Sequence, residues 1–289
     1  MSYNLCIWHA GCADGFGAAT VVAKALPHCV FGEGVYGDDP PNVAGAHVYL
    51  VDFSYRREVV EAMLEQAESV TIIDHHKSAM KDLEGLEHPR LEKHFNTMYS
   101  GAVLTWLYFF PEEPIPQLLL HIQDRDLWKK ELPNSDEICA ALYSHEFDFK
   151  LWDEFYADQS QLIIDGKALL RDRAKHTQLA LATEPEWVNI DGYKVPVLNA
   201  SRSIASELAQ ELAVLYNTPF AGVYQDRNGK RIFSLRSRKG FDVSEVAFAL
   251  NGGGHQTASG INIPIKRMHS IKASLTFRIK RWFVSMFTL

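Results

Sequence analysis

The sequence of 289 residues contains only four cysteines, and no two of them form a C-x-x-C pair. A zinc ribbon and a dithiol redox site therefore have no support. Residues 1–9 lack the basic region and apolar core of a secretory signal peptide, and no apolar run reaches transmembrane length. We therefore expect a soluble, cytoplasmic protein with reduced thiols and no integral membrane association.

Positive charge is also scarce, since 29 Lys and Arg face 36 Asp and Glu, which gives a net charge of -7. An acidic chain binds duplex DNA poorly without a broad basic face, so no duplex DNA partner is expected. The chain does contain 12 His beside its many acids. This composition favours a metal site built from oxygen and nitrogen ligands over a thiolate site, if the chain binds metal.

The first third of the chain alternates between strand and helix patterns. Apolar runs at 5–8, 48–51 and 70–73 predict three buried strands, and residues 17–26 and 56–67 between them predict helices. Continuous β-branched runs between helices are typical of parallel strands that are buried on both faces. The sequence therefore predicts an α/β domain with a mostly parallel sheet flanked by helices.

The chain then becomes more helical up to Pro185, which is a plausible stop for a long helix at 159–183. We place the domain boundary there, with one domain at 1–184 and a smaller mixed α/β domain at 185–289. Asp191-Gly192 and Asn228-Gly229 are typical hairpin turns. Further helices are predicted at 102–110, 115–122, 204–216 and 243–250, and hairpin strands at 187–198, 220–224 and 231–235.

Metal-binding side chains follow all three predicted strands of the first domain. His9 and Asp14 follow the first strand, Asp52 the second, and Asp74-His75-His76 the third. A lone Asp at a strand end is usually a turn former, but three coincident endings are hard to explain in that way. Because the carboxyl ends of parallel strands meet at one edge, where ligands bind, we expect these side chains to converge.

A fourth acidic site, Asp124-Arg125-Asp126, lies at the end of a predicted helix. Viewed alone it could be a solvated helix terminus. The flanking Leu118-Leu119-Leu120 and Leu127-Trp128 place these carboxylates beside an apolar wall instead. We therefore count this segment among the candidate metal-binding sites.

The second domain contains groups suited to phosphate. Gly252-Gly253-Gly254-His255 follows a helix, and consecutive glycines allow close approach of a ligand to the backbone and an anion nest of amides. A helix C-cap explains one of these glycines but not three. Arg236 is suited to bidentate phosphate binding, whereas Arg238 and Lys239 fit a solvated basic loop.

Mixed Asp and His ligands suit hard divalent ions such as Mn²⁺ or Mg²⁺. Two such ions about 3.5–4 Å apart can activate water and hold both the attacking and the leaving oxygen of a phosphoryl group. Phosphoester hydrolysis is therefore the predicted chemistry.

These residues also resemble the DHH phosphoesterases that carry a C-terminal DHHA1 domain, of the oligoribonuclease and exopolyphosphatase-related type. A bare D-H-H is a weak signal, whereas all the motifs in order, ending in G-G-G-H-x-x-A-x-G, are a strong one. The resemblance extends from about Leu5 to Ile263. Its motifs are Asp52, Asp74-His75-His76, Asp124-Arg125-Asp126-Leu127-Trp128, Ser234-Leu235-Arg236-Ser237, Asp242-Val243-Ser244, Gly252-Gly253-Gly254-His255 and Ala258-Ser259-Gly260.

The resemblance implies an α/β DHH domain and a smaller DHHA1 domain with the active site in the cleft between them. It implies that Asp52 bridges two ions, that Asp74 orients a ligand, and that His76 faces the substrate phosphate, so that Asp52, Asp74 and His76 are the catalytic residues. The metal ligands that it implies are His9, Asp14, Asp52, His75 and Asp124. The substrate-binding residues are Arg236, Gly253, Gly254 and His255.

Cys12 is a departure from the family pattern. Many members have two acids in the first motif, and Cys12 stands two residues before Asp14, where the missing acid would be. It is a soft ligand, an inert buried thiol, or a sign that one metal site is weak; a free Cys is most often structural. Whether the protein binds one ion or two therefore stays open.

The segment 265–289 has six basic residues and no acid, with apolar residues at helical spacing. This pattern fits an amphipathic helix that attracts nucleic acid or a membrane surface. A packed terminal helix with a solvated basic face is the more ordinary interpretation.

Two classes of function are compatible with these observations. The favoured one is a Mn²⁺- or Mg²⁺-dependent phosphodiesterase that acts on short oligonucleotides or dinucleotides, with a polyphosphate or pyrophosphate hydrolase as a related alternative. The other is a nucleotide-binding module whose catalysis has decayed. Buried acids and His without a metal would be costly to keep, which favours the enzyme. A homodimer is one assembly that the sequence leaves open.

Overall fold

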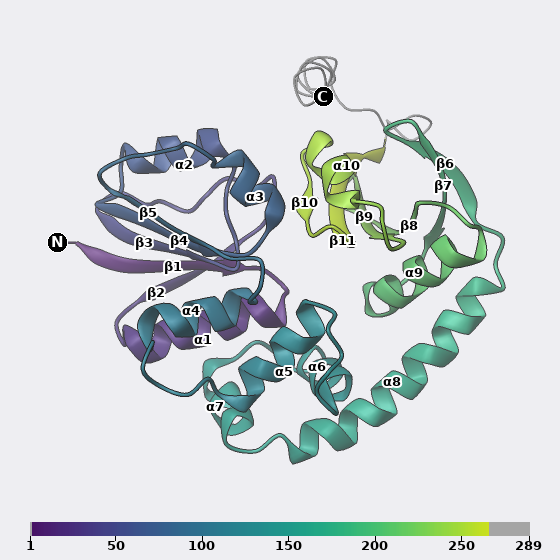
Figure 1. The fold of residues 1–289 in the computed structure, drawn as a ribbon, viewed down its shortest axis with the longest axis horizontal. Helices are drawn as coiled ribbons and strands as arrows, with labels where there is room; N and C mark the ends of the chain where they lie inside the picture. The colour runs from purple at the N-terminus through teal and green to yellow at the C-terminus, as the bar shows by residue number, and fades with distance from the viewer. Residues whose placement is uncertain (1, 266–289) are drawn as a thin grey trace. The chain divides into compact units, whose positions relative to one another are not determined.

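The computed structural model describes residues 2–265 (Figure 1), so the predicted basic helix lies outside the described residues from position 266 onward. The chain forms two compact units, which divide between Asp172 and Arg173. This division falls inside the long helix α8 (Ser160–Leu181), whereas the boundary predicted after residue 184 lies just beyond the end of that helix. Where an independently folding domain would end stays a prediction.

The first unit is built on a five-stranded parallel sheet, in agreement with the prediction from the sequence. The strands lie in the order β2-β1-β3-β4-β5, and every neighbouring pair is parallel. The strands are β1 (Tyr3–His9), β2 (Val30–Gly34), β3 (Ala46–Val51), β4 (Ser69–Asp74) and β5 (Leu91–Phe95).

Helices cover both faces of this sheet (Figure 1). The helices α1 (Ala13–Ala25) and α4 (Gly101–Phe109) pack on one face, and α2 (Arg57–Leu64) and α3 (Lys77–Asp82) lie over the other. Successive residues of a strand point to opposite faces. Trp8 therefore belongs to the apolar cluster of α1 and α4, and Ile7 to the cluster on the opposite face. Burial on both faces explains why β1, β3 and β4 are continuous apolar runs.

A second group of helices extends the first unit. These are α5 (Gln117–Asp126), α6 (Ser135–Leu142), α7 (Phe149–Ala157) and the first part of α8, up to Asp172. Helix α5 contacts α1 and α4, which brings its C-terminal end toward the carboxyl edge of the sheet. None of the helices at positions 2–265 is both long and apolar enough to cross a membrane.

The second unit contains a six-stranded mixed sheet in the order β10-β11-β9-β8-β7-β6, in which only β7 and β8 are parallel. The hairpin turns predicted at Asp191-Gly192 and Asn228-Gly229 are confirmed. The strands are β6 (Glu186–Ile190), β7 (Tyr193–Asn199), β8 (Phe220–Arg227), β9 (Lys230–Ser237), β10 (Gly253–Gly254) and β11 (Ala258–Pro264). The helices are η1 (Arg202–Ile204), α9 (Ala205–Leu215) and α10 (Val243–Ala249).

Candidate metal centre

The topology of the first sheet creates a binding position between β1 and β3. From β1 the chain continues to β2, at one edge of the sheet. From β3 it continues to β4, toward the opposite edge. Ligands of open α/β sheets bind at such a switch point, outside the carboxyl ends of the strands, and the order 2-1-3-4-5 is one of the common arrangements. His9 ends β1, and Asp52 follows β3 directly.

Side chains from four segments converge at this point. The Nδ1 atom of His9 lies 3.5 Å from Oδ2 of Asp52, and the Nε2 atom of His75 lies 3.0 Å from Oδ1 of Asp52. The same His75 nitrogen lies 3.6 Å from Oδ2 of Asp14 and 3.5 Å from Oδ2 of Asp126. The structure therefore brings together four of the five predicted metal ligands, and it adds Asp126.

Asp52 is at the centre of this group and has an unusual backbone. It is 1% exposed and adopts a left-handed conformation with φ of 53°. Asp tolerates this region better than most residues, but such a conformation persists only where its surroundings hold it. The backbone N–H of Asp52 donates to the carbonyl of Ile73 on the neighbouring strand. Strain of this kind at a sheet edge is typical of functional positions.

Gly101, at the start of α4, lies directly against Asp52. A Cβ atom at position 101 would come within 2.4 Å of the Asp52 Cβ and 2.7 Å of its Cα. No real Cβ contact is that short, so either the helix or Asp52 would have to move. Only glycine therefore allows α4 to begin at this position beside the cluster.

We expect the substitution Gly101→Ala to displace Asp52 and to weaken divalent-cation binding at least about tenfold, in the range found for altered partners of metal ligands. The overpacking should also destabilise the fold by about 1–3 kcal/mol. Titration calorimetry with Mn²⁺ and thermal unfolding would measure the two effects. The matched control is Gly32→Ala, where a Cβ would meet nothing closer than 3.9 Å. Equal Mn²⁺ affinity in the two variants would contradict this role for Gly101.

Asp14 caps the start of α4 through its carboxylate. Its Oδ2 atom accepts a hydrogen bond of 2.6 Å from the N–H of Gly101, and its Oδ1 atom accepts one of 3.1 Å from the N–H of Ala102. The first amides of a helix have no partner within the helix and attract negative charge. Each carboxylate oxygen can accept more than one interaction, so this cap still permits Asp14 to bind a cation.

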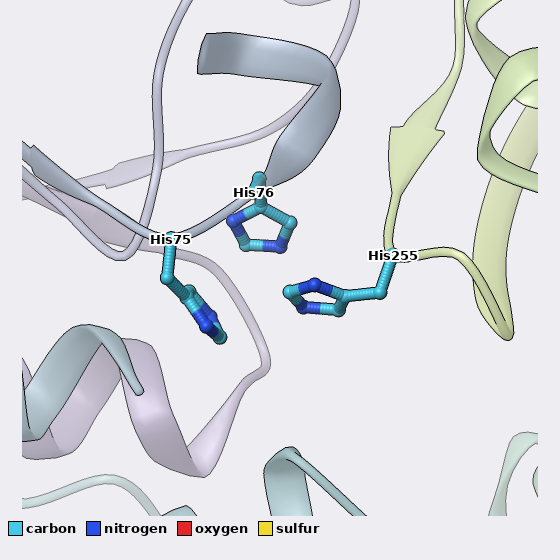
Figure 2. Close-up of side chains that lie close together, drawn as sticks. All are labelled: His75, His76 and His255. Atoms are coloured by element: carbon cyan, nitrogen blue, oxygen red, sulfur yellow. The ribbon is translucent and has the colours of Figure 1, made fainter. Parts of the chain in front are cut away.

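The DHH segment is fixed by its own aspartate. The Oδ1 atom of Asp74 accepts hydrogen bonds from the N–H groups of His75 (2.7 Å) and His76 (3.1 Å), and it lies 2.7 Å from Nδ1 of His76. Figure 2 shows the two imidazoles next to each other on the segment that joins β4 to α3. Their ring centroids are 4.9 Å apart. Because Asp74 engages Nδ1 of His76, the ring would present Nε2 to a substrate.

The two acids at the end of α5 lie in different environments. Oδ1 of Asp124 accepts a hydrogen bond of 2.8 Å from the N–H of Glu131, and its carbonyl accepts from Lys129, so Asp124 shapes the turn after the helix. Asp126, which was not among the predicted ligands, has its ligand oxygen within 4.8 Å of those of Asp14 and His75. The geometry therefore favours Asp126 over Asp124 as the acid of this segment that faces the cluster.

The closely spaced acids of the cluster shift one another's pKa values and that of His75. Burial, followed by repulsion from Asp52 and Asp126, raises the pKa of Asp14 well above its usual value. Burial would also raise the pKa of Asp52, but the close imidazoles of His75 and His9 hold it well below the usual value. Burial would lower the pKa of His75, but Asp52 and its acidic neighbours raise it to about 10. Protons therefore offset the carboxylate charge wherever a cation does not.

These residues fit a divalent cation. Both carboxylate oxygens of Asp52 and Nδ1 of His9 are buried and make no hydrogen bond of acceptable geometry within the described part of the chain. Burying such groups without hydrogen bonds costs free energy, which a shared cation would offset. Three sets of ligand atoms in this unit lie within 4.8 Å of one another, namely His9-Cys12-Asp52, Asp14-His75-Asp126 and Asp52-Asp74-His76.

Tyr36, in the loop after β2, is a neighbour of the cluster that the sequence did not indicate. Its ring lies 5.4 Å from that of His9 and 6.1 Å from that of His76, between ring centroids. Its hydroxyl is buried and makes no hydrogen bond to any of residues 2–265. Burial, followed by the charges of Asp74 and Asp52, raises its pKa well above the usual value, so it remains a neutral phenol. No sequence motif marks this position.

In the second unit, Arg236 and the glycines have clear structural partners. The Arg236 guanidinium donates to the carbonyl of Leu235 (2.8 Å) and to Oγ of Ser206 (2.6 Å), which fixes its direction. A Cβ at Gly254, where φ is 135°, would lie 2.5 Å from the carbonyl oxygen of Ala258. The close pairing of β10 with β11 therefore requires glycine here, whatever else these glycines do.

His255 follows β10 (Figure 2), and its N–H donates 2.8 Å to the carbonyl of Ala258. Gly253 pairs with Gly260 in the sheet. Substrate binding by Gly253, Gly254, His255 and Arg236 stays a prediction.

The parallel sheet and its buried His and Asp cluster define an α/β protein with a candidate divalent-cation centre. Residues 191–280 match the DHHA1 domain family. The chain is 30% identical over 291 residues to Uncharacterized protein R106 of Acanthamoeba polyphaga mimivirus, which covers 89% of this chain and 67% of that protein. With the DHH motif at the end of β4, the chain belongs to the DHH family of phosphoesterases with a C-terminal DHHA1 domain.

Two solved structures are similar along nearly the whole chain but at low scores. One is an uncharacterized protein from Helicobacter pylori G27, with 15% identity and a TM-score of 0.46, covering 99% of both chains. The other is a pGpG-specific phosphodiesterase from Vibrio cholerae, with 13% identity and a TM-score of 0.42, covering 99% of this chain and 98% of that one.

Proposed function

We propose that the chain is a divalent-metal-dependent phosphoesterase that hydrolyses phosphodiester bonds of short oligonucleotides or dinucleotides, with Mn²⁺ or Mg²⁺ as its ion. The observation that carries the proposal is the buried Asp52 carboxylate, which lies within ligand distance of His9 and His75 at the carboxyl edge of the sheet. Membership of a phosphoesterase family supports the reaction class. The acidic cluster supports the use of a cation.

The residues of the cluster have distinct proposed roles. His9, Asp14, Asp52, His75 and Asp126 would hold one or two divalent ions, with Asp126 in place of Asp124. A bound ion would supply Lewis acidity to the phosphoryl group and make water a better nucleophile near neutral pH. Asp74 keeps the His76 ring oriented through Nδ1, so His76 would meet a phosphate oxygen through Nε2.

A small substrate fits the charge of the molecule. A net charge of -7 opposes the wide phosphate contacts on which long nucleic acids depend. A short substrate needs only the cation and a few directed groups, of which Arg236 is already held in position by Ser206. This argument supports dinucleotides and short oligonucleotides over long strands.

The test is to incubate the purified protein with Mn²⁺ and a panel of dinucleotides, pAp, cyclic dinucleotides and polyphosphate. We expect mononucleotides to be released from the short linear diesters, and the activity to disappear with a chelator. Hydrolysis of polyphosphate alone would favour the phosphoanhydride alternative. If no nucleotide diester is turned over with any divalent ion, the proposal is wrong.

A further inference from the structure

Cys12 lies inside the cation cluster. It is the residue before α1, three positions after the end of β1. Its Sγ atom, a ring nitrogen of His9 and a carboxylate oxygen of Asp52 lie within 4.8 Å of one another. A single ion with ordinary bond lengths of about 2.0–2.3 Å to sulfur, nitrogen and oxygen could contact all three atoms.

The two partners of Cys12 in this set are unusual in themselves. Asp52 is 1% exposed, and both of its carboxylate oxygens are buried without a hydrogen bond of acceptable geometry in the part of the chain that is described. The Nδ1 atom of His9 is also buried and makes no hydrogen bond of acceptable geometry to the described residues. Buried polar atoms that are left in this way point to a ligand that satisfies them.

A tyrosine from a distant helix orients the sulfur. The hydroxyl of Tyr143, at the end of α6, accepts a hydrogen bond of 3.2 Å from the N–H of Ala13. The hydroxyl proton of Tyr143 therefore points away from Ala13. It is donated to Sγ of Cys12, which lies 3.9 Å from the hydroxyl oxygen. A donor beside sulfur stabilises the negative thiolate form and fixes its direction, as such groups do around metal sites.

Coordination to a metal ion deprotonates a thiol outright, so Cys12 would bind such an ion as a thiolate.

We propose that Cys12 is a thiolate ligand of the cation that His9 and Asp52 bind. Sulfur, nitrogen and oxygen together favour borderline ions such as Zn²⁺, Co²⁺ or Fe²⁺ more than an all-oxygen and nitrogen site would. The inference rests on the metal centre of the proposed function, and it changes the expected ion from a purely hard one. Cys12, which stands where many family members have an acid, would thus still bind the metal ion but would change which ion the site prefers.

Titration of the full-length protein with Co²⁺ tests the inference without measuring catalysis. We expect a near-ultraviolet sulfur-to-cobalt charge-transfer band in the wild-type protein, together with visible ligand-field absorption. The variant Cys12→Ser should lose the charge-transfer band and keep the visible absorption. The control Cys29→Ser should keep both, because Cys29 precedes β2 at the opposite end of the parallel sheet.

A second measurement uses the wild-type protein alone, so it does not depend on the folding of a variant. X-ray absorption of the Zn²⁺ form should show a sulfur neighbour at about 2.3 Å. In addition, Cys12→Asp should lower the ratio of Cd²⁺ to Mn²⁺ affinity more than about tenfold. Mutation of a group that only hydrogen-bonds to a metal ligand already changes metal affinity by about tenfold or more, and replacement of the sulfur ligand itself should have a larger effect.

Three results would overturn the inference. The first is Co²⁺ or Zn²⁺ binding with no sulfur signal in the wild-type protein, and the second is a charge-transfer band that survives in Cys12→Ser. Failure to bind either ion would overturn it as well. Turnover of dinucleotides with Mn²⁺ is measured separately, so the phosphoesterase proposal can stand when the thiolate inference fails.

Discussion

Replacing Asp52 with Asn is expected to lower kcat/KM for a dinucleotide by about a thousandfold or more. Asp52 belongs to two of the three sets of ligand atoms in this unit, the one with His9 and Cys12 and the one with Asp74 and His76, so its loss affects an ion bound by either set. A metal centre contributes several kcal/mol to the stabilisation of transition-state charge. Each factor of ten in rate corresponds to about 1.36 kcal/mol.

The measurement combines steady-state kinetics in Mn²⁺ with calorimetry of Mn²⁺ binding. The variant keeps the shape of the side chain, so circular dichroism should show a folded protein. The matched control is Asp39→Asn, which removes the same charge from an exposed position of the same unit. That control should retain nearly the full rate.

An opposite result would identify the other class of function. If wild type and Asp52→Asn show the same background hydrolysis but bind nucleotide equally well, the chain is a nucleotide-binding module rather than an enzyme. A large loss of rate together with a large loss of Mn²⁺ affinity would exclude that alternative.

The sequence predicts the position of this centre because the strand ends are local features. The runs before His9, Asp52 and Asp74 are apolar and β-branched, which identifies β1, β3 and β4 and the edge where they end. The edge strands were harder to predict. Residues 91–95 read Leu-Glu-Lys-His-Phe, and charged residues of this kind protect a sheet edge instead of marking a buried strand.

Two of the short helices, α6 and α7, and two distant neighbours of the cluster were beyond the same reasoning. The helices α6 and α7 have 8 and 9 residues, and helices of that length depend on tertiary packing for their stability. Tyr36 and Tyr143 approach the cluster from a loop and from α6, with no motif around them. Their positions follow from how the elements pack, which a single sequence does not record.

The two acids of α5 show where motif reasoning reaches its limit. Residues two positions apart on a helix point about 200° from each other, since each residue turns the helix by about 100°. Only one member of Asp124 and Asp126 can therefore face the sheet edge. The motif contains both, and the rotation of the helix against α1 and α4 decides between them.

We therefore expect Asp126→Asn and Asp124→Asn to differ sharply. Asp126 lies 3.5 Å from Nε2 of His75, so its substitution should lower Mn²⁺ affinity and kcat/KM by about a hundredfold. Loss of a metal ligand should have at least as large an effect as mutation of a group that hydrogen-bonds to a ligand, which reaches about a hundredfold. Asp124 bonds the N–H of Glu131, so its substitution should cost about 1 kcal/mol of stability and change the rate less than tenfold.

The pair forms its own control, because both variants remove one negative charge from the same helix and any general effect of charge cancels in the comparison. Mn²⁺ calorimetry, dinucleotide kinetics and urea unfolding of the two variants would separate binding from stability. A greater loss of Mn²⁺ affinity in Asp124→Asn than in Asp126→Asn would restore Asp124 as the ligand. In that event α5 would have to rotate when the ion binds, since the hydrogen bond from Glu131 now holds the Asp124 carboxylate in the turn after the helix.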